Sequence, residues 1–113
     1  MIAAPLFLLA AGIGALTRAV TATALNDPRS VPWGTLSVNV IGCGVAGAAS
    51  ALSGPVATVL VTGGLGALTT FSTFVLEVIR LWRSGRRLSS VTYALATPIV
   101  CFAAAWASRT LVT

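Results

Sequence analysis

A run of polar and aromatic residues inside a long apolar stretch is the part of this sequence best suited to chemistry. The run covers residues 69–74 (TTFSTF) and follows a glycine-rich segment at 63–68 (GGLGAL). Glycine and β-branched residues weaken a helix, so the pattern predicts a break here. A break frees main-chain carbonyls that can bind a cation and amide N–H groups that can face an anion. The alternative is an unbroken helix whose hydroxyls bond back to their own backbone.

Other residues at helical spacing could share a pathway with this run. Thr35 and Asn39 are four residues apart, and Phe71 and Phe74 are three apart, so each pair can occupy one helix face. The positive edge of a phenyl ring can approach an anion. A third set at four-residue spacing consists of Tyr93, Thr97, Cys101 and Ala105. Asn39 could instead form a structural hydrogen bond between helices, and each phenylalanine could be simple packing.

The elements that must position these residues are membrane helices. The chain has 113 residues, of which 57% are hydrophobic and 8% charged, whereas globular domains carry about 25% charged residues. Charged residues are absent from 1–17, 31–76 and 88–108. The central stretch is too long for one span, and Ser53-Gly54-Pro55 is a turn signal within it. We therefore predict a single all-α domain whose four transmembrane helices cover about 2–25, 32–52, 56–80 and 88–110.

A cleavable signal peptide is the alternative for the first span, because Ala22-Thr23-Ala24 resembles a cleavage site. No basic residue precedes the apolar run, and the run is longer than the core of a signal peptide. A membrane helix is therefore the favoured interpretation.

The basic residues predict which way the chain crosses the membrane. Four spans place most of them on the side of the first and third loops, namely Arg18, Arg29, Arg80, Arg83, Arg86 and Arg87. Only Arg109 falls on the other side. Arginine is enriched in cytoplasmic loops, so we expect a cytoplasmic loop between spans 3 and 4 and both termini outside. This explains the net charge of +5 better than binding to nucleic acid does.

Composition excludes several chemistries. The chain has no His and only two acids, Asp27 and Glu77, so a Ser-His-acid triad or a His-based metal site cannot form, and we expect no enzyme. Its two Cys cannot make a structural zinc site in one chain. The G-x-G-x-x-G match at 42–47 lacks the strand and the later acid of a dinucleotide site. We expect Glu77 to pair with Arg80 at the interface, which leaves a pathway without carboxylates that suits an anion.

These motifs are similar to those of the Fluc (CrcB) family of fluoride channels. The resemblance extends over essentially the whole chain and rests on 14–18 (GALTR), 34–42 (GTLSVNVIG) and 63–74 (GGLGALTTFSTF). It implies an antiparallel dimer with two fluoride pores and passive fluoride efflux across a prokaryotic plasma membrane. It also implies a structural sodium ion buried at the dimer centre.

The resemblance assigns roles to individual residues as well. It implies that the main-chain carbonyls of Gly66 and Thr69 hold the sodium ion. The anion pore would be lined by Asn39, Phe71, Phe74, Thr35, Tyr93, Thr97 and Arg18. The positions in span 4 follow from spacing, and Cys101 stands where a hydroxyl residue is expected.

Antiparallel assembly conflicts with the strong bias of the arginines toward one side. The simplest solution is a heterodimer with an oppositely biased homologue, and a homodimer is the alternative. Two rival functions remain open at this point. A small four-helix multidrug exporter should carry an acid in span 1, and a non-conducting scaffold would use its glycines only for packing.

Overall fold

Helices form every regular element in the part of the chain that the computed structural model describes, which is residues 3–27 and 30–112. In chain order they are α1 (Ala3–Leu25), α2 (Trp33–Ala48), the 3₁₀-helix η1 (Ala49–Ala51), α3 (Gly54–Ala57), the π-helix η2 (Thr58–Leu65), α4 (Gly66–Leu68), α5 (Ser72–Arg83) and α6 (Arg87–Val112).

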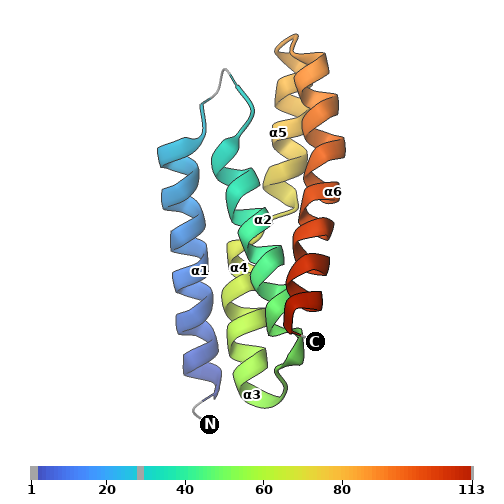
Figure 1. The fold of residues 1–113 in the computed structure, drawn as a ribbon. Helices are drawn as coiled ribbons and strands as arrows, with labels where there is room; N and C mark the ends of the chain where they lie inside the picture. The colour runs from blue at the N-terminus through green and yellow to red at the C-terminus, as the bar shows by residue number, and fades with distance from the viewer. Residues whose placement is uncertain (1–2, 28–29, 113) are drawn as a thin grey trace.

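Four helical stretches are long and apolar enough to cross a membrane. They are Ala4–Leu25, Trp33–Ala51, Gly54–Arg83 and Arg87–Val112. The prediction of an all-helical chain with four membrane-spanning helices is thus confirmed. The stretches run side by side, with the start of α2 and the α5–α6 turn at one end and the start of α1 and α3 at the other (Figure 1).

Polar side chains occupy the interior of this bundle, and apolar side chains cover its outside. Among the described residues, the buried polar side chains are Thr35, Asn39, Glu77, Ser90 and Thr97, and the buried large apolar ones are Val38, Leu81 and Tyr93. Many large apolar side chains are exposed on all the long helices. Such a surface suits hydrocarbon rather than water. The chain is therefore a multi-pass protein of the cell membrane.

The arginines gather at the end of the bundle that holds the α5–α6 turn. Arg80 and Arg83 lie in the last turn of α5, and Arg86 and Arg87 follow directly. Arg109 lies in the last turn of α6. The predicted sidedness of the chain stays a prediction, and its Arg29 lies outside the described residues.

Glycine and asparagine set the ends of several helices. Gly54 (φ 78°), the first residue of α3, and Gly85 (φ 87°), in the turn after α5, adopt the left-handed conformation, which costs glycine little. At the start of α2, Asn26 Oδ1 accepts hydrogen bonds from the N–H groups of Gly34 at 2.7 Å and Thr35 at 3.2 Å. These two amides have no partner inside the helix, so the preceding loop supplies their cap.

Close helix contacts are made at small residues. Gly14 of α1 lies directly against the main chain of Gly64 and Leu68, and a methyl group at position 14 would overlap the Gly64 carbonyl. Gly12 lies on the same helix, and a methyl group added there would meet only open space. In lipid, such close packing takes the place of hydrophobic burial in holding helices together.

This difference predicts opposite outcomes for two matched substitutions. Gly14→Ala should destabilise the protein by about 1–3 kcal/mol, because the added methyl forces α1 away from α4. Gly12→Ala should be neutral or slightly stabilising, because alanine favours a helix by up to ~1 kcal/mol over glycine. The measurement is the fraction that stays monodisperse in detergent after heating. Equal loss in both variants would contradict the assigned contact.

Candidate functional site

A non-helical linker separates α4 from α5, and the side chain of Asn39 holds it. α4 ends at Leu68, α5 begins at Ser72, and Thr69 is extended with φ −79° and ψ 153°. Asn39 Nδ2 donates to the Thr70 carbonyl at 3.1 Å, and the Thr70 N–H donates to Asn39 Oδ1 at 2.8 Å. Asn39 is only 7% exposed. One buried amide thus satisfies both backbone groups of a linker residue, as apolar surroundings require.

These bonds leave two main-chain carbonyls without their helical donors. In a continuous helix the Thr70 N–H would donate to Gly66 and the Thr73 N–H to Thr69. Here the Thr70 N–H donates to Asn39 Oδ1, and the Thr73 N–H donates to Thr70 Oγ1 at 3.2 Å. No other donor among the described residues replaces them. Gly66 and Thr69 are the residues expected to hold sodium, and free carbonyl oxygens are ligands that suit a hard cation.

A cavity of about 280 Å³ opens beside this linker, between α2, α5 and α6. Its lining comprises Asn39, Cys43, Thr69, Thr70, Phe71, Phe74, Thr97, Pro98 and Cys101. The structure therefore brings together four residues predicted for the anion pore, namely Asn39, Phe71, Phe74 and Thr97. We call this space the linker cavity.

Aromatic rings and unpartnered hydroxyls line one side of this region. The ring centroids of Phe71 and Phe74 are 6.1 Å apart, and those of Phe74 and Tyr93 are 5.1 Å apart. The hydroxyls of Tyr93 and Thr97 are buried and have no hydrogen-bond partner among the described residues. A buried hydroxyl normally finds a partner, so these two are available to an ion or to water. Phe71 is 77% exposed in the single chain.

Glu77 lies in the interior, and the predicted ion pair with Arg80 at the interface is wrong. Its side chain is 4% exposed, and Oε1 accepts a 2.7 Å hydrogen bond from the hydroxyl of Thr35. Oε2 has no partner among the described residues. Glu77 sits on the face of α5 that meets α2, whereas Arg80 is exposed. Glu77 is not among the residues that line the linker cavity, so the expectation of a pathway without carboxylates stays a prediction.

The spacing of the sequence could have revealed this position of Glu77. It follows Phe74 by three residues and Thr73 by four, so it shares a helix face with the polar run. The predicted pairing with Arg80 rested on the same spacing, because Arg80 follows Glu77 by three residues. Nothing in the local sequence distinguishes these two positions for Glu77, and only its hydrogen bond with Thr35 of α2 decides between them.

Three of the predicted pore residues are not part of the lining of the linker cavity. Thr35 belongs to a separate network, in which its hydroxyl accepts from Asn26 Nδ2 at 3.1 Å and donates to Glu77. Arg18 is half-buried on α1, the helix that packs on η2, α4 and α2. Tyr93 reaches the cavity only through its ring contact with Phe74.

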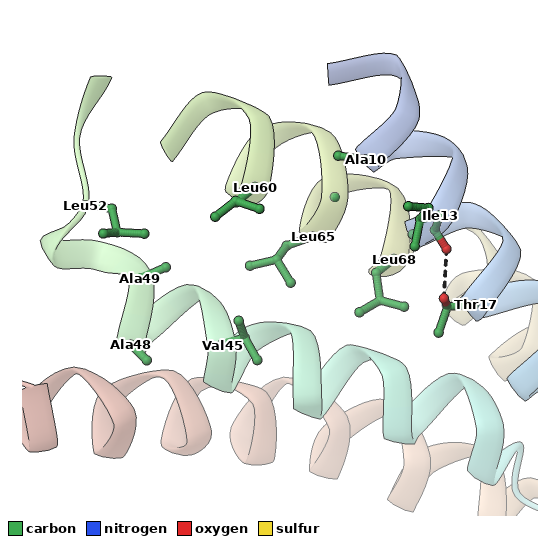
Figure 2. A pocket seen from close by; sticks show the side chains of 12 residues that line it. Ala10, Ile13, Thr17, Val45, Ala48, Ala49, Leu52, Leu60, Leu65 and Leu68 are labelled. Carbon is green, nitrogen blue, oxygen red and sulfur yellow. Dashed lines mark hydrogen bonds between the residues drawn. The ribbon is translucent and has the colours of Figure 1, made fainter. Parts of the chain in front are cut away.

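A second, larger pocket lies on the side of α2 that faces α1, and its lining is almost wholly apolar. It measures about 630 Å³ and is bordered by Ala10, Ile13, Gly14, Thr17, Val45, Ala48, Ala49, Leu52, Leu60, Gly64, Leu65 and Leu68. Figure 2 shows aliphatic side chains of α1, α2 and the η2–α4 segment converging on it. Its one polar side chain, Thr17, donates to the Ile13 carbonyl at 2.8 Å. We call this pocket the apolar groove.

Comparison with known proteins gives a consistent result. Residues 6–109 match the family described as CrcB-like protein, Camphor Resistance (CrcB). This chain belongs to the CrcB family. It is 42% identical over 100 residues to the fluoride-specific ion channel FluC 2 of Rhodococcus jostii, which covers 87% of this chain and 88% of that protein. It is 38% identical over 107 residues to the fluoride-specific ion channel FluC of Magnetococcus marinus, with 87% of each chain covered.

The role of Asn39 in holding the linker of this CrcB protein can be tested directly. Asn39→Leu has a similar volume but removes both hydrogen bonds to Thr70, which leaves buried backbone groups unpaired at a cost of about 1–3 kcal/mol each. We expect faster hydrogen exchange at residues 69–73, measured by mass spectrometry. Ser37→Ala, two residues away on α2, removes only a local bond to Trp33 and should leave this exchange unchanged. Unchanged exchange in Asn39→Leu would contradict the assignment.

Proposed function

We propose that this protein is a fluoride-selective channel through which fluoride leaves the cell passively, so that fluoride toxicity is relieved. The linker cavity carries this proposal, because it places uncharged donors and phenyl edges beside a gap in a membrane helix. The relatives named fluoride-specific ion channels support it. The polar residues that line the linker cavity fit such a role, since they offer neutral amide and hydroxyl donors.

The donors of this region match the needs of a small, strongly hydrated anion. Asn39 donates one amide hydrogen to the Thr70 carbonyl, and its second amide hydrogen is available to an anion. The hydroxyls of Thr97 and Tyr93 are unpartnered, and the edge of the Phe74 ring adds a weak positive site. Conduction needs sites that bind well enough to admit the ion and weakly enough to release it. A series of neutral donors meets this need better than a buried cation would.

The Thr35–Glu77 pair has a positioning role in this proposal. The hydroxyl hydrogen of Thr35 is donated to Glu77, so that residue has no donor left for fluoride. The pair instead ties α2 to α5 on the Arg-rich side of the linker cavity. The negative charge of the Glu77 carboxylate would also lower the local concentration of anions at that end of the cavity.

The rival functions fit the same residues less well. An exporter of cationic drugs needs an acid facing its substrate in the first span, and α1 has none. A scaffold whose glycines only pack gives no reason for the unpartnered hydroxyls of Tyr93 and Thr97. Fluoride flux distinguishes all three possibilities.

The working assembly in this proposal is an antiparallel dimer built across the apolar groove and the linker. The groove adjoins the linker through Leu65 and Leu68, and the exposed Phe71 would gain cover from a second chain. Two copies would bring the freed carbonyls of Gly66 and Thr69 together. Four oxygens then suit a structural sodium ion, which supplies a fixed positive charge between the two pores.

Flux through reconstituted protein tests the channel proposal. Liposomes reconstituted from detergent, in which the chain can take both orientations, should release fluoride to an external electrode when a potassium ionophore balances the charge. Phe74→Leu should slow this efflux at least about tenfold, which corresponds to ~1.4 kcal/mol in the barrier, because the ring edge is lost. Phe102→Leu is the matched control, since Phe102 is exposed on the outside of α6. Efflux that is equal in both variants would contradict the assigned pathway.

The orientation of the partner chain needs its own experiment. A variant in which Arg83, Arg86 and Arg87 become Gln and basic residues are added at the α2–α3 turn should insert the other way round. We expect efflux from cells that make both forms and little from cells that make wild type alone. Efflux with wild type alone would refute the need for an oppositely oriented partner. Absence of efflux from both would refute the channel.

Removal of sodium tests the proposed use of the freed carbonyls without relying on flux. A cation that binds only the assembled form stabilises it by mass action. The detergent-solubilised dimer should therefore dissociate at a lower temperature in choline chloride than in sodium chloride of equal concentration. Identical dissociation in the two salts would argue against a sodium site at Gly66 and Thr69.

A further inference from the structure

Two cysteines lie beside each other in the linker cavity, and the proposed function makes no use of their chemistry. Cys43 lies on α2 one turn after Asn39, and Cys101 lies on α6 one turn after Thr97. Both are free thiols and both line the cavity. The two sulfurs therefore face the same space from opposite helices.

The packing of α2 on α6 fixes this pair in place. Gly47 and Ala105 follow the two cysteines by four residues each, so they lie one turn further along the same faces. A methyl group at Gly47 would overlap the carbonyl of Ala105, so the two backbones are in direct contact there. This close contact of the two helices holds Cys43 and Cys101 in the lining of one cavity before any ligand arrives.

We propose that Cys43 and Cys101 form a binding site for a soft, thiol-seeking divalent cation, for which Hg²⁺ is the probe. Thiolate sulfur selects soft metal ions over hard ones. A cation that prefers two ligands in line needs no third residue, which agrees with the absence of larger His, Cys, Asp or Glu groups among the described residues. The hydroxyl of Thr97, which is buried and has no partner among the described residues, belongs to the same lining.

The charge balance of binding suits this apolar place. Each thiol loses its proton to water, each sulfur forms one bond to the metal, and no electron is transferred. Two thiolates and one divalent cation form a neutral unit, so the bound state leaves no net charge in a region of low dielectric. A hard cation would gain little from sulfur and would lose its water.

Binding at this site should block the ion pathway, a consequence that rests on the proposed function. The metal would occupy the cavity that also contains Asn39 and Phe74. Fluoride would then lose the space through which it is proposed to pass. The site itself does not depend on that function.

The first experiment measures binding in detergent without any flux. Reduced, desalted protein is loaded with Hg²⁺ and washed with a monothiol competitor, and the retained metal and the free thiols are counted. We expect about one Hg²⁺ per wild-type chain and protection of both thiols from maleimide. Cys43→Ser and Cys101→Ser should each lose the metal in the wash, because a single sulfur competes poorly with the free thiol. Retention by either single variant, or loss from wild type, would overturn the proposal.

Folding is controlled in the same samples. Serine has nearly the shape of cysteine, and each variant is accepted only if it elutes as wild type does from a sizing column. Wild-type protein unfolded in detergent, which has both thiols but not their arrangement, should release the metal faster than the folded protein. Equal release from folded and unfolded chains would also overturn the proposal.

The second experiment separates the site from the channel. In liposomes, Hg²⁺ should slow fluoride efflux of wild type at least about tenfold, and the double variant Cys43→Ser/Cys101→Ser should be unaffected. Retained metal together with unchanged wild-type efflux would refute the block while leaving the site intact. If wild type shows no efflux before metal is added, the proposed function fails and the binding result still stands.

Discussion

The exchange of two hydrogen bonds between Asn39 and Thr70 is the interaction on which the centre of this protein depends. Backbone inside a membrane cannot leave its amides and carbonyls unpaired, so a helix can be interrupted only where another group replaces its bonds. Asn39 does so for Thr70. It can reach because α2 lies close to the linker at Gly42, where a methyl group would overlap that of Thr69. The helix packing and the interruption therefore require each other.

The two hydrogen bonds between Asn39 and Thr70 lie between two sides of the molecule that differ in chemistry. On the side of α5 and α6 lie the buried hydroxyls and the carboxylate of Glu77, several of them without a protein partner among the described residues. On the side of α1 lies the apolar groove. Polar groups that lack partners need an ion or water, whereas an apolar surface needs another helix or lipid. The interrupted helix thus supports both parts of the proposal, an ion pathway on one side of it and an interface on the other.

Periodicity revealed the parts of this arrangement that depend on one helix at a time. It grouped Thr97 with Cys101, and it grouped Phe71 with Phe74, and both pairs line the linker cavity. It failed where two helices had to be placed relative to each other. Glu77 was paired with Arg80 because both lie on α5, while its actual partner, Thr35, is 42 residues away. Asn26 gave no local signal either, because its role as the cap of α2 depends on how the loop folds back.

The arginines act in opposite directions at two stages of the life of this chain. During insertion, they favour a single orientation and so oppose an antiparallel pair. During assembly of the proposed dimer they would favour an antiparallel pair of identical chains, because two parallel copies would place the clusters at Arg80, Arg83, Arg86 and Arg87 side by side. The molecule is 50 Å long, and charges at opposite ends of it are separated by far more than the screening length of about 8 Å. In an antiparallel homodimer an oppositely oriented copy would therefore meet no repulsion from this cluster, and the obstacle to pairing would lie in its insertion.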